Sequence, residues 1–426
     1  MLTAMDGNNR DKRVAIVGAG PAGLAAARVL LANTKLQVTV FEQAPQIGGV
    51  WYYNDGDKES AMYDHLETNL PKQIMAYSGF PFPDYDSVFP PRTRVLEYLL
   101  LYYRAFVEGR AQMCFNTQVT SLEKIIDKNK WQVITSMGKK STFDYVVVAN
   151  GHFRTPNLPD DIPGWAEWAQ LAPHASIHST QYTNCAEFRD KTVVVVGNGS
   201  SGVDIANQIS SVAGTVYHSV RDPSKASWPP ESPIRVVGAI QNMDAARRTL
   251  YFQHGQVVPD VDQVIWATGF RFHFPFLKSY RGVLFPEDSP SGVTRICGLW
   301  EHLIFAEDPT LAFPLLNQGV VTFPLAESHA CLIAQVFSGR IPREQMPPVE
   351  TSAGKSVMSP DDVLYYRHIN EILLAHGGEQ DPFRPVIWDD KMLKLRIDGK
   401  EAKTRRNFEL VHRSLNLRKL GLPYSL

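Results

Sequence analysis

Cysteine is scarce in this chain of 426 residues, and its four copies are widely separated: Cys114, Cys185, Cys297 and Cys331. Because no C-x-x-C pair occurs, the pattern argues against a disulfide framework, a zinc site and a dithiol redox centre. Neither sign of charge is in excess, since 43 basic and 44 acidic residues leave a net charge of −1. The sequence therefore gives no reason to expect bulk attraction to nucleic acid or to an anionic membrane.

Long apolar runs are also absent. No segment approaches the roughly 20 apolar residues of a membrane span, and residues 1–13 lack the apolar stretch of a signal peptide. We therefore expect a cytoplasmic protein without a membrane anchor, long enough for two or three domains. The sequence also shows no nucleophile motif, no paired carboxylates and no metal-ligand cluster, because His174 and His178 lie in a loop-rich segment.

What is present is a phosphate-binding pattern near the N-terminus. An apolar run from Val14 to Val17 predicts a buried strand, and Gly18, Gly20 and Gly23 follow at G-x-G-x-x-G spacing before an Ala/Leu-rich helix. In such a turn the first glycine permits the tight bend, the second lets a pyrophosphate approach the backbone, and the third lets the helix pack closely on the strand. The helix N-terminus adds free N–H groups for the phosphates.

A second strand is expected from Gln37 to Phe41, and it ends at Glu42, where a carboxylate is expected to meet a ribose hydroxyl. The paired glycines before Trp51 suggest backbone close to a ligand, with Trp51 either a wall of the site or an ordinary core aromatic. Asn69 carries both a donor and an acceptor, which suits the edge of a heteroaromatic ring. The alternative is that Asn69 only makes a turn before Pro71.

The same pattern recurs later in the chain. A strand from Thr192 to Val196 precedes Gly197, Gly199 and Gly202, and the strand after the next helix ends at Arg221, where the first copy has a carboxylate. A carboxylate would repel a 2′-phosphate, whereas arginine can bind one bidentately. The second site is therefore expected to select NADPH over NADH, unless this arginine is only a solvated surface charge.

Each fingerprint is followed by an apolar strand that ends at a glycine, namely Tyr145–Ala149 before Gly151 and Gln263–Ala267 before Gly269. These half-repeats predict an α/β fold with two Rossmann-like dinucleotide-binding domains, one holding a flavin and the other an exchanging nicotinamide. We expect a discontinuous FAD-binding domain at 1–155 and 275–426, with the NADPH-binding domain inserted at 156–274. Further strands are expected at 119–125 and 130–135, and helices at 94–107, 203–210, 328–337 and near 361–376.

Together these motifs resemble the flavin-containing monooxygenases. The stretches that carry the resemblance run in the family's order over about residues 12 to 340: Gly18 to Gly23, Gly48 to Trp51, Leu66 to Pro71, Ala149 to His152, Ile162 to Gly164, Gly197 to Gly202, Ala267 to Gly269 and Pro309 to Phe313. The stretch from Arg418 to Pro423 contains no apolar run, so the resemblance leads us to expect a soluble member similar to the shorter fungal ones.

The resemblance implies that NADPH reduces FAD, that dioxygen adds at flavin C4a to give a hydroperoxide, and that one oxygen atom passes to a soft nitrogen or sulfur nucleophile of a small molecule. Asn69 is the implied catalytic residue, hydrogen-bonding near the flavin N5/C4a edge or the bound NADP⁺. A homodimer is one expected assembly. The cofactor-binding residues implied by the fingerprints and the resemblance are Gly18, Gly20, Pro21, Ala22, Gly23, Glu42, Gln43, Gly49, Val50, Trp51, Thr68, Asn69, Leu70, Val119, Gly197, Gly199, Ser200, Ser201, Gly202, Val203, Ser219 and Arg221.

One stretch departs from the family pattern Phe-x-Gly-x-x-x-His-x-x-x-(Phe or Tyr). His178 and Tyr182 match it, but Ala172 and His174 stand at its aromatic and glycine positions. This departure keeps an NADPH oxidase that releases hydrogen peroxide as an alternative function. A Baeyer–Villiger-type monooxygenase is a second alternative, although Thr183 follows Tyr182 in place of the Trp-Pro or Trp-Asp pair of those relatives.

Overall fold

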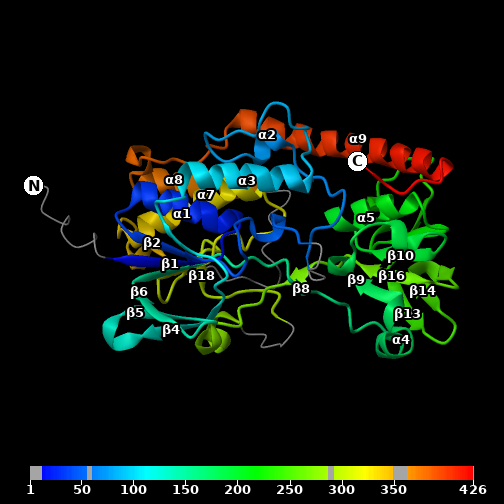
Figure 1. The fold of residues 1–426 in the computed structure, drawn as a ribbon, viewed down its shortest axis with the longest axis horizontal. Helices are drawn as coiled ribbons and strands as arrows, with labels where there is room; N and C mark the ends of the chain where they lie inside the picture. Colours follow the sequence, from blue (N-terminus) through cyan, green and yellow to red (C-terminus); the bar gives the residue numbers. More distant parts are fainter. Residues whose placement is uncertain (1–11, 55–59, 286–291, 349–361, 426) are drawn as a thin grey trace, which may run out of the picture. The chain divides into compact units, whose positions relative to one another are not determined.

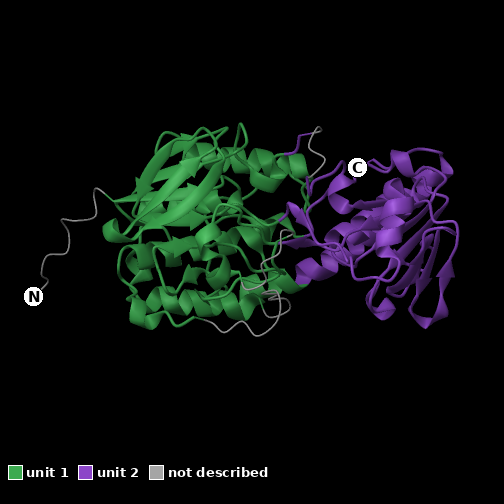
Figure 2. Ribbon diagram, turned by 90° about the horizontal axis from the view of Figure 1, so that it is seen from below, with its two compact units in different colours: residues 1–52, 70–152, 272–397 green, residues 53–69, 153–271, 398–426 purple. Residues whose placement is uncertain are grey.

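The computed structural model describes residues 12–54, 60–285, 292–348 and 362–425, and the chain divides into two compact units (Figures 1 and 2). Unit 1 comprises residues 1–52, 70–152 and 272–397, and unit 2 comprises 53–69, 153–271 and 398–426. This division differs from the expected one mainly because 53–69 and 398–426 belong to unit 2, and the two inner boundaries lie three residues earlier than expected, at 152/153 and 271/272. Hydrogen bonds explain the difference: the N–H of Asp64 donates to Thr183 O (2.8 Å), and the Arg418 side chain donates to Ala213 O (2.7 Å).

A seven-stranded sheet forms the centre of unit 1. Five consecutive strands of this sheet are parallel, as the buried apolar runs predicted, and two short antiparallel strands extend it at one edge. In sheet order the strands are β18 (Leu299–Trp300), β19 (Ile304–Phe305), β20 (Leu311–Ala312), β7 (Tyr145–Val148), β1 (Arg13–Val17), β2 (Gln37–Phe41) and β3 (Gln112–Cys114).

Helices cover one face of this sheet (Figure 1). They are α1 (Pro21–Asn33), α2 (Lys72–Met75), α3 (Arg92–Phe106), α7 (Thr322–Phe337) and α8 (Asp362–Ala375). Helix α7 begins six residues before the expected start at Ser328 (328 − 322), which corrects the prediction. Pro324 lies in the first turn of this helix, where a proline lacks only an N–H that has no partner within the helix.

A three-stranded antiparallel sheet and the short helix α6 (Arg281–Leu284) complete unit 1. The strands are β4 (Val119–Ile125), β5 (Lys130–Thr135) and β6 (Lys140–Phe143), and the first two confirm the predicted pair. Trp131 and Phe143 on this sheet are fully buried in an apolar cluster with Phe41, Val146 and Val148.

Unit 2 is built on a five-stranded parallel sheet, in the order β12 (Ile234–Val237), β11 (Thr215–Ser219), β10 (Thr192–Val196), β16 (Gln263–Trp266) and β9 (Ser176–His178). Helix α5 (Ser200–Ser210) follows β10, as the second fingerprint predicted. The sequence did not predict α4 (Trp165–Leu171), nor the antiparallel sheet of β13 (Ile240–Asp244), β14 (Thr249–Phe252) and β15 (Val257–Val258). A two-stranded sheet pairs β8 (Thr155–Pro156) with β17 (Phe270–Arg271).

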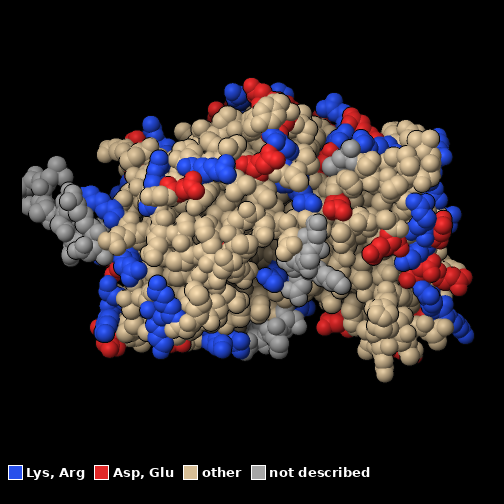
Figure 3. Space-filling view, in the orientation of Figure 1, with Lys and Arg blue, Asp and Glu red and all other residues tan. Residues whose placement is uncertain are grey.

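The C-terminal helix α9 (Asp390–Lys419) was also not predicted. Its sequence is strongly charged, so the apolar periodicity that signals a helix is weak. Residues from Asp398 onward belong to unit 2, where Leu410 and Val411 are buried. Figure 3 shows that basic and acidic side chains intermingle over the face drawn, in keeping with the near-zero net charge.

Candidate dinucleotide-binding sites

The glycine-rich turn of unit 1 is held by the protein backbone. Gly18 has φ +104°, its N–H donates to Phe41 O (2.8 Å), and a Cβ at this position would collide with the carbonyl oxygen of Ala149. A Cβ at Gly23 would collide with the carbonyl oxygen of Gly18. The first and third glycines of the fingerprint are therefore required by the fold, as the spacing predicted.

Unit 2 repeats this turn. Gly197 has φ +117°, its N–H donates to Ser219 O (2.9 Å), and a Cβ here would collide with the carbonyl oxygen of Ala267. At Gly202 a Cβ would collide with the carbonyl oxygen of Gly197. The two fingerprints thus form the same local structure, which supports the interpretation of the chain as two related half-repeats.

The middle glycine of unit 2 is different, because no protein atom requires it. A Cβ at Gly199 would have no heavy atom within 4 Å, and its φ of −79° suits any residue. The N–H of Gly202 and the hydroxyls of Ser200 and Ser201 belong to the first turn of α5, which has no side-chain cap and no acidic residue. Open space at the uncapped N-terminus of a helix suits a pyrophosphate.

Helix α1 has a similar uncapped N-terminus at Pro21 and Ala22. Unlike Gly199, however, the middle glycine of this fingerprint, Gly20, is packed against a second loop. A Cβ at Gly20 would lie 3.3 Å from Gly49 Cα, and a Cβ at Gly49 would lie 2.7 Å from Gly20 Cα. Gly49 is therefore explained by the close approach of two backbone turns, whereas Gly48 has φ +128° and a Cβ there would meet the Leu96 side chain. Trp51 packs edge-on against Phe323 at the start of α7, with ring centroids 6.4 Å apart.

Glu42 closes the turn of unit 1. One carboxylate oxygen accepts from the N–H of Ala19 (2.7 Å) and the other from the N–H of Ala44 (2.8 Å). Burial raises the pKa of this carboxyl, and the backbone hydrogen bonds oppose that shift. Each oxygen keeps capacity for a further hydrogen bond, so the residue can still meet a ribose hydroxyl. The neighbouring Gln43 is exposed.

Arg221 stands at the corresponding end of the second repeat. It is exposed and forms no hydrogen bond or ion pair with the residues that the structure describes. The nearby loop is tied to the glycine turn, since Asn198 Nδ2 donates to Lys225 O (3.1 Å). Ser219, in contrast, is buried, and its hydroxyl donates to Gly238 O (2.8 Å), so its side chain is engaged within the sheet.

Other predicted site residues have varied settings. Val119 is buried in the apolar cluster below β4, so its side chain serves packing. Thr68 is buried and Asn69 is exposed, and both belong to unit 2, whereas the half-buried Leu70 belongs to unit 1. Val203 lies half-buried in the first turns of α5.

His178, one of the two positions at which this chain keeps the family pattern, has a structural role. One ring nitrogen, Nε2, lies 3.1 Å from Gly269 O, and the other, Nδ1, accepts from the N–H of Thr180 (3.3 Å). Burial lowers the pKa of His178 to about 4, so the ring is neutral and donates from Nε2. The residue therefore links β9 to the turn after β16, and no metal-binding group involves it within the described residues.

Sequence reasoning missed Asn317, which precedes α7 in unit 1. Its side chain is 3 % exposed and influences the pKa of the nearby Tyr365, yet neither amide atom forms a hydrogen bond of regular geometry. A buried amide of this kind fits a polar group of a bound ligand. No local sequence signal marks Asn317, because its burial depends on contacts with segments distant in the chain.

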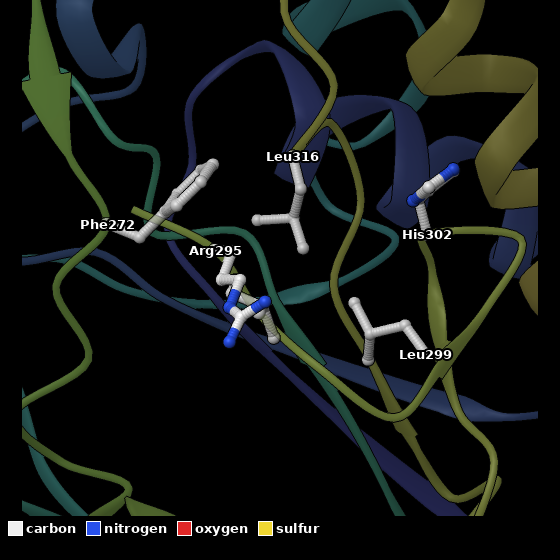
Figure 4. Close-up of a pocket in the computed structure, with 6 residues that line it drawn as sticks. Phe272, Arg295, Leu299, His302 and Leu316 are labelled. Carbon is white, nitrogen blue, oxygen red and sulfur yellow. The ribbon is translucent and has the colours of Figure 1, made fainter. Parts of the chain in front are cut away.

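A small cavity in unit 1 is lined by Phe272, Arg295, Ile296, Leu299, His302 and Leu316 (Figure 4). It has room for about one water molecule. Burial lowers the pKa of His302, which keeps its ring neutral. None of these residues belongs to a fingerprint, and the cavity is too small for an organic substrate.

Comparison with known proteins decides the family. Residues 11–228 match the family described as flavin-binding monooxygenase-like. The chain belongs to this family. FAD and NADPH are therefore its cofactors, and the two uncapped glycine turns fit their phosphates. None of the helices in the described part of this flavin monooxygenase is long and apolar enough to cross a membrane.

The relatives extend along the whole chain. A thiol-specific monooxygenase of Saccharomyces cerevisiae is 37% identical over 431 residues, covering 98% of both chains. The flavin-containing monooxygenase FMO GS-OX5 of Arabidopsis thaliana is 34% identical, covering 83% of this chain and 78% of its own. Among solved structures, S-allyl-L-cysteine S-oxygenase from Allium sativum is 25% identical with a TM-score of 0.75, covering 96% of this chain and 98% of its own.

Proposed function

We propose that this flavin monooxygenase consumes NADPH and transfers one oxygen atom from dioxygen to a soft nucleophile, sulfur or nitrogen, of a small molecule. The observation that carries the proposal is the pair of equivalent glycine turns with different ends. The turn of unit 1 ends at the buried carboxylate of Glu42, whereas that of unit 2 ends at the exposed and unpaired Arg221. These ends suit a 2′-hydroxyl and a 2′-phosphate, respectively.

In this proposal unit 1 holds FAD and unit 2 holds NADPH. The N–H groups that begin α1 and α5 bind the two pyrophosphates, Glu42 accepts from a ribose hydroxyl, and Arg221 binds the 2′-phosphate bidentately. When bound, the flavin supplies the oxygen-transfer chemistry expected from the family resemblance, with NADPH as the reductant. The amide of Asn69 hydrogen-bonds to the reactive end of a bound cofactor and helps to exclude water.

Sulfur is the first nucleophile to test. The relative from Saccharomyces cerevisiae is named a thiol-specific monooxygenase, and the similar structure from Allium sativum is an S-oxygenase. We therefore propose thiols and sulfides as the preferred substrate class and amines as the second. A cytoplasmic location and a homodimer stay predictions, which cell fractionation and analytical ultracentrifugation would test.

The deciding experiment is rapid mixing of the anaerobically NADPH-reduced protein with oxygenated buffer, first without substrate and then with a small thiol or amine. A persistent flavin spectrum, neither reduced nor oxidised, that decays faster with thiol and yields an oxygenated product supports the proposal. Direct return to oxidised flavin with one peroxide per NADPH, whatever the substrate, favours the NADPH oxidase. Conversion of a cyclic ketone to a lactone would favour the Baeyer–Villiger alternative.

A further inference from the structure

The segment 63–69, which we call the strap, carries Asn69 at its end. The strap belongs to unit 2, where Thr68 is buried and Asn69 is exposed. Because Asn69 is an exposed side chain next to a fixed main chain, the contacts of the strap decide where its amide stands within unit 2.

Helix α9 holds the residues just before Asn69. Lys403 Nζ donates to Thr68 O (3.0 Å). Arg406 binds Glu67 through two hydrogen bonds, from Nε to Oε2 (3.0 Å) and from a terminal nitrogen to Oε1 (2.5 Å). The Glu67 side chain is only 8% exposed, so this bidentate pair is shielded from water and directional.

Helix α5 holds the other end of the strap. Asp204 Oδ2 accepts from the Tyr63 hydroxyl (2.8 Å) and from Gln208 Nε2 (3.2 Å), and Gln208 Oε1 accepts from the Tyr182 hydroxyl (3.0 Å). Lys403 lies close enough to Asp204 to lower the pKa of that carboxyl, although burial is the larger effect and raises it. The strap is therefore tied to the helix whose N-terminus faces the proposed NADPH pyrophosphate.

We propose that Lys403 and Arg406 of α9, together with Asp204 of α5, are positioning residues that fix the strap, and with it Asn69, relative to helix α5 of unit 2. This inference rests on the proposed function, in which Asn69 acts on a bound cofactor. It gives α9 a role that its sequence alone does not suggest. Lys403 is the most direct of the three, because it holds the carbonyl group that is joined to the Asn69 nitrogen.

The test compares the full-length variants Lys403→Met and Lys403→Arg with the wild type. Methionine keeps the apolar stem of lysine but removes the donor and the charge, whereas arginine restores both. Lys400→Met is the matched control, because Lys400 is an exposed lysine on the same helix. Two readouts are taken: amide hydrogen exchange of a peptide covering residues 60–71, and peroxide released per NADPH in the presence of a thiol.

In Lys403→Met we expect exchange of the strap peptide to rise about tenfold, which corresponds to the loss of one charged hydrogen bond. Peroxide release per NADPH should rise while the rate of anaerobic flavin reduction by NADPH changes less than about twofold, because only the amide of Asn69 is displaced. Lys403→Arg should restore both readouts toward the wild type, and Lys400→Met should change neither.

Unchanged exchange in Lys403→Met overturns the inference, and so does faster exchange with unchanged coupling. If Lys403→Met does not fold, Glu67→Gln takes its place, since it keeps the shape of the side chain and removes its charge. The outcome for the proposed function is separate, because it is read in the wild type. A wild type that oxygenates no substrate refutes the proposed function, and the hydrogen-exchange readout still decides whether α9 holds the strap.

Discussion

Replacing Gly199 with alanine separates cofactor binding from folding in the proposed NADPH site. The backbone at Gly199 has φ −79° and ψ 179°, which alanine adopts without strain, and the new methyl group would meet no protein atom within 4 Å. Two small effects oppose each other. Alanine restricts the unfolded chain, which stabilises by about 0.4–1 kcal/mol, but it is a poorer N-cap residue than glycine. The free energy of unfolding should therefore change by less than about 1 kcal/mol.

Cofactor binding should respond much more strongly. The methyl group fills the space through which a pyrophosphate would reach the N–H groups that begin α5. Each hydrogen bond to a charged group contributes about 1.5–3 kcal/mol, and a change of 1.4 kcal/mol is about tenfold in Kd. We therefore expect the Kd for NADP⁺, measured by calorimetry, to rise by at least about tenfold.

Gly202→Ala is the matched control for this prediction. Its Cβ would collide with the carbonyl oxygen of Gly197, and backbone cannot rotate away as a side chain could. Such overpacking costs about 1–3 kcal/mol or more, so this variant should unfold at a clearly lower temperature. The reasoning is refuted if Gly199→Ala binds NADP⁺ as tightly as the wild type, or if it unfolds as early as Gly202→Ala.

Three further predictions concern single side chains. Arg221→Ala should raise the KM for NADPH by about tenfold or more, because a bidentate contact to the 2′-phosphate is lost. The KM for NADH should stay nearly unchanged. An equal rise in both KM values would make Arg221 an ordinary surface charge. Asn69→Asp should increase peroxide release during turnover, because the amide donor is lost; wild-type oxygenation without extra peroxide contradicts its role. Burial lowers the pKa of His178 from 6.5 to about 4. Between these two pH values the unfolded chain binds more protons than the folded one, so the free energy of unfolding falls as the pH drops from 6.5 to about 4. The shift in pKa corresponds to about 3 kcal/mol of stability. In urea unfolding at several pH values, His178→Phe should lack this contribution to the pH dependence of the free energy of unfolding. If His178→Phe shows the wild-type pH dependence, His178 is not a buried neutral ring.

Much of the fold follows from short stretches of sequence. The strands at β1, β2, β10 and β11 and the turns after them lie where the apolar runs and glycine spacings predicted, because these signals act over a few neighbouring residues. The collisions that a Cβ would cause at Gly18 and Gly23 involve backbone within the same βαβ unit or its neighbouring strand. Such local requirements can be read from one chain.

Other features depend on contacts between distant segments. The local pattern predicts a glycine at position 49 near a ligand, and the structure adds a second requirement, because the backbone of Gly20, 29 positions earlier (49 − 20), lies against it. Ser219 was expected to face a cofactor, and only its sheet neighbour shows that its hydroxyl is engaged by Gly238 O. Neither partner is visible in the local pattern, because each is set by how strands and turns pack.

The sequence by itself determined the two glycine turns, their opposite end charges and the family, since each depends on residue types at fixed spacing. Only the tertiary structure decided that the strap and the second part of α9 belong to unit 2. Lys403 and Thr68 lie 335 positions apart, and no periodicity in a charged helix reveals which carbonyl group its lysine will bind. That pairing arises from packing, which places charges where a buried backbone oxygen needs a donor.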